Sequence, residues 1–169
     1  MSSGPTGMPS LVGREVSHYR IVAKLGSGGM GVVYEAEDTK LARRVALKFL
    51  PAEMARDGQA LERFQREARA ASALNHPGIC TVHAIDQHEG QHFIAMELLE
   101  GEPLNKTLRR GPLSVDQALP IAADMLAALA AIHARGIVHR DLKPSNVFFT
   151  AHGIKLLDFG LARPELQTT

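Results

Sequence analysis

The chain has 169 residues, enough for one domain with a hydrophobic core, and 45% of them are hydrophobic and 22% charged, as in soluble globular proteins. A formal net charge of +1 argues against a strongly basic surface for nucleic acid or anionic membranes. The single cysteine, Cys80, excludes an internal disulfide, and its apolar neighbours predict a buried side chain rather than a reactive thiol.

The first segment, residues 1–17, is predicted to be a disordered lead-in. Met1–Ser10 is rich in Ser, Gly and Pro and lacks the basic start and apolar core of a secretory signal. The most apolar stretch, Ala118–Ile132, is too short to span a bilayer and contains Pro120 and Asp124, so we interpret it as a core helix. These features predict a cytoplasmic protein without a membrane segment.

Alternating apolar and polar residues predict a strand-rich half over residues 18–96. A glycine-rich turn joins the first two strands into a hairpin. Apolar residues at three- and four-residue spacing predict one helix over residues 60–74, with Leu61, Phe64, Ala68, Ala71 and Leu74 on its buried stripe. The predicted strands cover residues 18–25, 32–37, 44–50, 79–85 and 92–96, which gives a five-stranded antiparallel sheet.

After a connector at residues 97–102 the pattern becomes helical. Ser114 followed by Gln117 is a capping-box signature and predicts a helix to about Arg135. Pro120 conflicts with this helix, so either the helix kinks there or its regular part begins near that residue. The inward side chains are predicted to be Met125, Leu126, Leu129 and Ile132, and two short strands are predicted at residues 147–150 and 154–157.

The first candidate functional motif is the glycine run from Gly26 to Gly31, followed by Val33. A dinucleotide-binding turn would require a helix directly after it, whereas the residues that follow alternate as a strand does. A glycine hairpin exposes backbone N–H groups that can close over a triphosphate, and Val33 can cover a base beside it. The motif alone also fits an ordinary hairpin turn.

The second motif is Lys48 on the third strand, where it shares a face with Ala46. The small alanine leaves room for a flat adenine while the ammonium group reaches the phosphates. A lysine inside a fold requires a carboxylate partner, and Glu67 on the following helix is the better candidate, with Glu62 as the alternative. Two solvated charges are an equally good interpretation of this pairing on its own.

The third motif, His139 to Asn146, is the most specific. In phosphoryl transfer a carboxylate orients the attacking hydroxyl and takes its proton, a role open to Asp141. A cation contacts the transferred phosphate, a role open to Lys143, and Asn146 can supply an oxygen ligand to Mg²⁺. The fourth motif, Asp158-Phe159-Gly160, ends the last predicted strand and can supply a second Mg²⁺ ligand from Asp158.

These four motifs, in this order and context, resemble the signature of the protein kinase superfamily. The likeness extends from about His18 to Arg163 and is greatest to the bacterial, eukaryotic-like serine/threonine kinases. It implies an α+β kinase fold with an N-lobe (residues 18–96), a hinge (97–102) and part of a mostly helical C-lobe (103–169), and it implies ATP and Mg²⁺ as cofactors. The family pattern would place in the ATP site Gly26, Ser27, Gly28, Gly29, Met30, Gly31, Val33, Ala46, Lys48, Met96, Glu97 and Leu99.

The resemblance also implies individual roles. Met96 would be the gatekeeper residue, and the backbones of Glu97 and Leu99 would bind adenine. Glu67 would pair with Lys48, and Lys143 would indicate serine/threonine specificity. Arg140, beside Asp141, resembles the arginine of kinases that are activated by phosphorylation of the activation loop, where it can bind the new phosphate.

The chain departs from the family after Asp158-Phe159-Gly160, because no Ala-Pro-Glu motif follows. This suggests a fragment of a longer kinase or a truncated product, in which the helix over residues 114–135 would expose apolar surface. From the kinase resemblance, the leading hypothesis for the function is phosphorylation of Ser or Thr in protein substrates. The alternatives are a non-catalytic ATP-binding module, which the motifs cannot separate from an enzyme, and a small-molecule kinase. Self-association or regulatory domains in a longer parent chain are further expectations.

Overall fold

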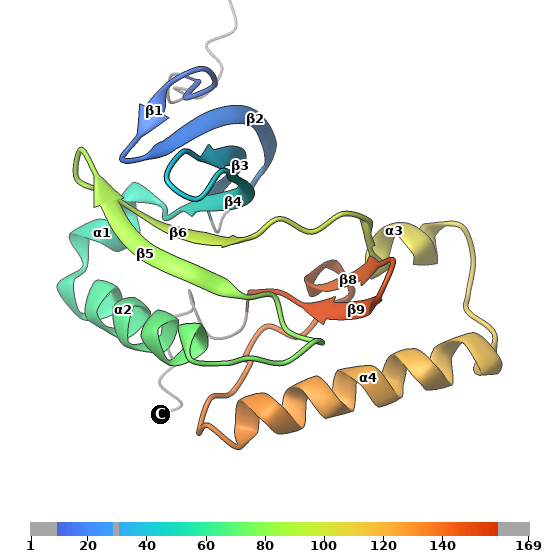
Figure 1. Ribbon diagram of the computed structural model, residues 1–169. Helices are drawn as coiled ribbons and strands as arrows, with labels where there is room; N and C mark the ends of the chain where they lie inside the picture. The colour runs from blue at the N-terminus through green and yellow to red at the C-terminus, as the bar shows by residue number, and fades with distance from the viewer. Residues whose placement is uncertain (1–9, 29–30, 159–169) are drawn as a thin grey trace, which may run out of the picture.

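The computed structural model describes residues 10–28 and 31–158, which form a curled sheet followed by a mainly helical part (Figure 1). The first sheet has six antiparallel strands in the order β1-β2-β3-β4-β6-β5, and a small second sheet has the order β7-β8-β9. The predicted α+β kinase-like class is confirmed. The strands are β1 Glu15–Val16, β2 Tyr19–Gly28, β3 Gly31–Asp38, β4 Arg43–Phe49, β5 Val82–His88, β6 Gln91–Glu97, β7 Glu102–Pro103, β8 Val147–Thr150 and β9 Gly153–Leu156.

Strand β1 is an addition to the five strands that the sequence predicts. Val16 pairs with Tyr19 through a tight turn in which Ser17 has a φ of 56°. Val16 is 1% exposed and joins the core of the sheet. Two residues carry no periodicity, so the sequence pattern could not reveal this strand. The part of the predicted lead-in at residues 15–16 therefore belongs to the sheet.

The predicted strand at residues 79–85 begins later than expected, at Val82. Ile79 instead forms a parallel bridge with Leu156 of β9, and the backbone N–H of Cys80 donates to the carbonyl oxygen of Leu156 at 3.0 Å. Residues 78–80 bond to β9 through Gly78 and Cys80, and pairing with β6 begins only at Thr81, whose carbonyl oxygen accepts from Glu97. This segment thereby connects the sheet half to the helical half.

Helix α2, Gly58–Ser72, confirms the predicted helix and its buried stripe. The side chain of Asp57 caps it by accepting hydrogen bonds from the backbone N–H groups of Gln59 and Ala60. Phe64, Ala68 and Ala71 are buried on this helix, and Leu61 packs against them. Two short helices, α1 Ala52–Arg56 and α3 Leu104–Arg109, were not predicted, because five or six residues are too few to show a helical period.

Helix α4, Val115–His133, begins with the predicted capping box between Ser114 and Gln117. It contains Pro120, so the alternative that the regular helix begins near that residue is wrong. Leu126 was predicted to face inward but is 66% exposed, and Ala128 is buried instead. Ala128 lies one helical turn before the buried Ile132, whereas Leu126 falls on another face.

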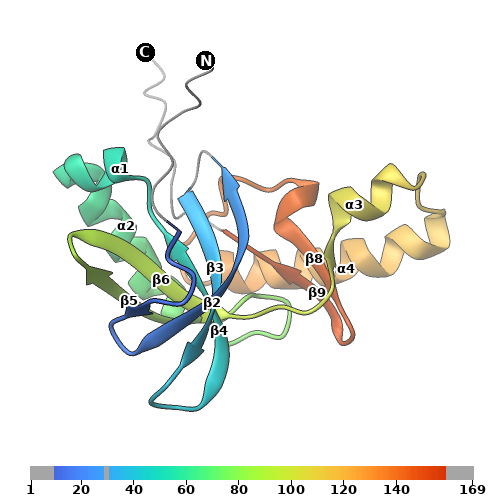
Figure 2. The same cartoon turned by 90° about the horizontal axis from the view of Figure 1, so that it is seen from above.

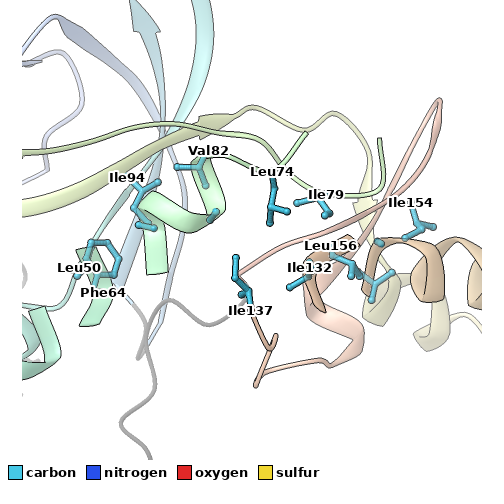
Figure 3. Packing of buried hydrophobic residues seen from close by; sticks show 14 residues of the cluster. Leu50, Phe64, Leu74, Ile79, Val82, Ile94, Ile132, Ile137, Ile154 and Leu156 are labelled. Atoms are coloured by element: carbon cyan, nitrogen blue, oxygen red, sulfur yellow. The ribbon is translucent and has the colours of Figure 1, made fainter. Parts of the chain in front are cut away.

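Helix α4 is longer than the predicted apolar stretch Ala118–Ile132 and by length and composition alone could cross a membrane, so its length does not distinguish a core helix from a membrane span. Packing supports a role in the fold, because α4 lies along the β8–β9 hairpin (Figure 1). Besides the cluster within the sheet that contains Val16, a second hydrophobic cluster runs from the sheet half, with Leu50, Phe64 and Ile94, to the helical half, with Ile132 and Leu156 (Figure 3). The two halves are thus one packed unit, and the site lies where they meet.

Candidate active site

A cavity of about 490 Å³ lies between the curled sheet and the β8–β9 hairpin. The view from above shows the strands β2, β3 and β4 on one side of the connector and the β8–β9 hairpin with α4 on the other (Figure 2). The volume of this cavity is in the range of small-molecule binding sites. The predicted residues that line it are Val33, Ala46, Lys48, Met96, Glu97, Leu99 and Asp158.

The sequence analysis missed several lining residues, namely Leu25, Leu98, Gly101, Pro103, Lys106, Phe148 and Leu157. Two of them carried a usable signal. Leu25 is the last apolar residue before the glycine run, and Phe148 lies two positions after Asn146 at the start of β8. Pro103 and Lys106 come from β7 and α3, which were not predicted.

The register of the sheet places the predicted base-facing side chains together. Val33 of β3 pairs with Lys48 of β4, and Ala46 pairs with Met96 of β6. All four line the cavity. Side chains two positions apart share a face of a strand, which is why Ala46 and Lys48 reach the same space.

The glycine hairpin extends β2 and β3 beyond Val33, with Gly28 opposite Gly31 and Gly26 opposite Val33, and its described residues Gly26, Ser27, Gly28 and Gly31 are not among those that line the cavity. Gly31 has a φ of 110°, and a Cβ atom there would overlap the carbonyl oxygen of Phe49. Only glycine fits such a position. A Cβ atom added at Gly26 or Gly28 would meet no other atom within 4 Å, so the surface at these two glycines is open. The predicted site residues Gly29 and Met30 lie outside the described residues, and Ser27 pairs with Val32.

Lys48 is 6% exposed, and its Nζ atom donates to the Oδ1 atom of Asp158 at 2.7 Å. The predicted ion pair between Lys48 and Glu67 is therefore not formed among the described residues. Glu67 instead accepts from the guanidinium of Arg140 at 3.0 Å, while Glu62 is exposed. The reason is proximity, because α2 presents Glu67 to Arg140 in the loop at residues 139–146 (here called the catalytic loop after its predicted role), and the segment after β9 presents Asp158 to Lys48. Burial raises the pKa of Glu67 despite the opposing effect of Arg140 and two further arginines.

The loop after α4 brings three predicted side chains together. Asn146 is 6% exposed, and its Nδ2 atom donates to the backbone carbonyl of Asp141 at 2.9 Å and to its Oδ2 atom at 3.2 Å. The ammonium group of Lys143 lies 3.4 Å from the same Oδ2 atom. A short 3₁₀ turn, η1 Pro144–Asn146, folds the loop back so that these groups meet.

His139 is a structural member of the site that was not assigned a role from the sequence. It is 2% exposed, its Nδ1 atom accepts from the backbone N–H of Asp141 at 3.2 Å, and its Nε2 atom lies 2.7 Å from the carbonyl oxygen of Leu157. Burial lowers the pKa of His139, which keeps the ring neutral with its proton on Nε2. Its position two residues before Asp141 was the available signal.

Leu157 connects the catalytic loop to Asp158. Its backbone N–H donates to the carbonyl oxygen of Asn146 at 2.9 Å, and its own carbonyl accepts from His139. Asp158 follows directly with a φ of 52°, an uncommon backbone conformation for a residue other than glycine. Asp158 and Asn146 are thereby held on adjoining loops.

The two predicted metal ligands fit a hard cation. Both Nδ2 hydrogen bonds of Asn146 leave its Oδ1 atom without a donor among the described residues. The second carboxylate oxygen of Asp158 is likewise not used by Lys48. Carboxylate and amide oxygens are the ligands that Mg²⁺ takes, with phosphate and water completing its six positions. Within residues 10–28 and 31–158 no cluster of three His, Cys, Asp or Glu side chains could hold a metal by itself.

At the base-facing edge, Met96 and Leu99 line the cavity as the kinase resemblance implies. The backbone N–H of Glu97 donates to the carbonyl oxygen of Thr81 at 2.9 Å, which leaves that group unavailable to an adenine. Any backbone hydrogen bond from Glu97 to the base would therefore involve its carbonyl oxygen.

Comparison with known proteins agrees with this geometry. The family model of the protein kinase domain matches residues 19–168. Serine/threonine-protein kinase PknA of Mycobacterium tuberculosis is 45% identical over 152 residues, which is 86% of this chain and 35% of that protein. Serine/threonine-protein kinase PrkC of Bacillus subtilis is 40% identical over 162 residues, which is 94% of this chain and 25% of that protein.

A solved structure gives the same result. The kinase domain of Mycobacterium tuberculosis PknI, crystallised as a point mutant, superposes with a TM-score of 0.85 at 36% identity, covering 92% of this chain and 64% of that one. The present chain thus spans about a third or less of the two kinases above and just under two thirds of a solved kinase domain. By sequence and by fold, this chain belongs to the protein kinase family.

Proposed function

We propose that this chain binds ATP in the cavity beneath the glycine hairpin and transfers its terminal phosphoryl group to Ser or Thr hydroxyls of protein substrates. The observation that carries the proposal is the connection of both ends of the site through Leu157. Asp141 and Asn146 lie on one side of it, and Asp158 with Lys48 on the other. Such convergence of a carboxylate, cations and metal-type oxygens suits phosphoryl transfer.

Each side chain has a role that follows from its position. Asp141 would accept the proton of the attacking hydroxyl, whose oxygen forms the new bond to phosphorus as the bond to the ADP oxygen breaks. Lys143, beside the Asp141 carboxylate, would contact the transferred phosphoryl group. Lys48 would contact the inner phosphates from the cavity wall. A lysine two residues after the aspartate supports Ser/Thr rather than Tyr as the acceptor, by resemblance to the family.

Asn146 and Asp158 would hold Mg²⁺ through the oxygens that their other contacts leave open. Bound there, the ion would offset negative charge on the phosphate oxygens. Arg140 would bind phosphate on an activation loop, in exchange for Glu67. Both assignments are part of the proposal.

The proposed organisation is an N-lobe over residues 18–96, a hinge over 97–102 and C-lobe residues from 103 onward. Protein substrates, a cytoplasmic location and association with regulatory domains complete the proposal. The names of the relatives support protein substrates, whereas the location and the regulatory domains rest on the resemblance to the family.

The test is transfer of labelled phosphate from ATP to a generic Ser/Thr-containing protein by the purified chain. We expect Asp141→Asn to reduce transfer by about a hundred-fold or more, since general-base groups contribute roughly 10²–10⁴. Asp116→Asn, at an exposed aspartate in the first turn of α4, is the matched control. ATP binding without any transfer by the unaltered chain would instead assign a non-catalytic nucleotide-binding module.

A further inference from the structure

An ion pair at the back of the cavity joins the connector to the strand that leads to Asp158. The Nζ atom of Lys155 donates to the Oε2 atom of Glu97 at 2.8 Å, and the same oxygen accepts from the backbone N–H of Thr81 at 3.3 Å. The two side chains are 18% and 30% exposed, so solvent screens the pair only in part. None of the sequence motifs required Lys155.

The two residues belong to different parts of the site. Glu97 is the last residue of β6 and lines the cavity where the base is proposed to lie. Lys155 lies on β9, three residues before Asp158. Because alternate residues of a strand share a face, Lys155 is on the same face as Leu157, which also lines the cavity. The ion pair therefore joins the base end of the site to β9, the strand that leads through Leu157 to Asp158.

The backbone beside this pair is fixed independently. The N–H of Leu156 donates to the carbonyl oxygen of Gly78 at 2.8 Å, and the N–H of Cys80 donates to the carbonyl oxygen of Leu156. Leu156 is fully buried, and Ile79 lies beside it in the core (Figure 3). These bonds hold β9 beside residues 78–80, and the Lys155–Glu97 pair adds a side-chain link from β9 to the end of β6.

Electrostatics support one local cluster. Burial raises the pKa of the Cys80 thiol, the charges of Glu97 and Asp158 raise it further, and the charge of Lys155 lowers it. Lys155 offsets the charge of the Glu97 carboxylate, to which it is directly bonded. Its loss would leave the Glu97 carboxylate, held by Thr81, without its cation.

We infer that Glu97 and Lys155 are positioning residues that couple the base end of the ATP site to the metal ligand Asp158. The inference rests on the proposed function. By linkage, such a pair raises the affinity for a ligand that occupies both ends, while a ligand confined to the base end gains little.

The experiment measures three dissociation constants for the purified chain by calorimetry: ATP with Mg²⁺, ATP with EDTA, and adenosine with Mg²⁺. We expect Lys155→Met to weaken binding of ATP with Mg²⁺ by roughly five-fold or more, as for a typical coupling between sites. Adenosine binding should remain within about two-fold, and Lys155→Arg should restore most of the loss. Arg20→Met, which removes an exposed ion pair between Arg20 of β2 and Glu37 of β3, is the control.

Lys155→Gln removes the charge but keeps a polar side chain, so it provides the same comparison if Lys155→Met does not fold. An equal loss for ATP and adenosine, or an unchanged benefit from Mg²⁺ in both variants, would overturn the inference while leaving the proposed function intact. Failure of the unaltered chain to bind ATP would overturn both.

Discussion

The side chain of Asn146 is oriented by Asp141, to which it donates two hydrogen bonds of 2.9 and 3.2 Å. These bonds use the amide nitrogen and direct the Oδ1 atom away from Asp141. An amide held in this way presents an oxygen, the atom type that a hard cation requires. The proposed metal site thus depends on a contact within the catalytic loop as well as on Asp158.

Removal of Mg²⁺ should weaken ATP binding by about five-fold or more, because the ion couples the phosphates to Asn146 and Asp158. Titration of ATP with Mg²⁺ and with EDTA measures this effect. In Asp158→Asn the difference between the two conditions should largely disappear, whereas Asp86→Asn, at an exposed residue of β5, should preserve it. Equal affinity in both conditions for the unaltered chain would remove these two residues from the metal site.

Lys48→Met should raise the dissociation constant for ATP by about ten-fold or more, since a charged hydrogen bond contributes roughly 1.5–3 kcal/mol. Methionine matches the length of the buried stem, so the fold should persist. Lys40→Met, at an exposed lysine in the turn after β3, is the matched control. Fluorescence titration with an ATP analogue measures binding, and a circular-dichroism spectrum of each variant shows whether it is folded. Unaltered affinity for ATP in Lys48→Met would contradict the assignment of Lys48 to the phosphates.

The sequence predicted the parts of the fold that have a period. The stripe of α2, the capping box of α4 and the five longer strands all follow from spacing. It could not predict β1, α1 or α3, which are too short for a period to show. Leu126 was misplaced because every face of α4 carries apolar residues, so hydropathy alone does not identify its buried side.

The candidate site shows the same division. Strand alternation placed Ala46 and Lys48 correctly on one face of β4, because that relation is local. The partner of Lys48 is a tertiary contact, and two carboxylates from distant segments, Glu67 and Asp158, compete for it. The sequence alone does not show which carboxylate pairs with Lys48, because the pairing depends on how α2 packs against the catalytic loop. The Glu97–Lys155 pair was missed for the same reason.

Gly31→Ala should destabilise the chain, because its φ of 110° strains any residue with a side chain and the new Cβ would meet the carbonyl of Phe49. Strain of this kind costs about 1–3 kcal/mol before the overlap is counted. Gly28→Ala, on the opposite strand of the hairpin with open space around it, should cost much less. Urea unfolding of both variants compares the two, and equal stability would mean that β3 can shift away from β4 at little cost.

Cys80 should be chemically inert in the folded chain. Burial, followed by the charges of Glu97 and Asp158, raises the pKa of its thiol to about 12. An exposed thiol titrates near about 8.5, so at neutral pH the folded chain presents almost no thiolate. Iodoacetamide should therefore label the denatured chain rapidly and the native chain only at the rate of unfolding. Rapid labelling of the native chain would show that the thiol reaches solvent.

The same thiol should make stability fall at high pH. Between about pH 9 and 12 the unfolded state releases the Cys80 proton while the folded state keeps it, so the free energy of unfolding decreases as pH rises, by at most about 1.4 kcal/mol per unit. Lysines and tyrosines titrate in this range too, so the informative quantity is the difference between the unaltered chain and Cys80→Ala. That difference should shrink with rising pH, because alanine releases no proton on unfolding. A constant difference would mean that Cys80 has the same pKa in both states.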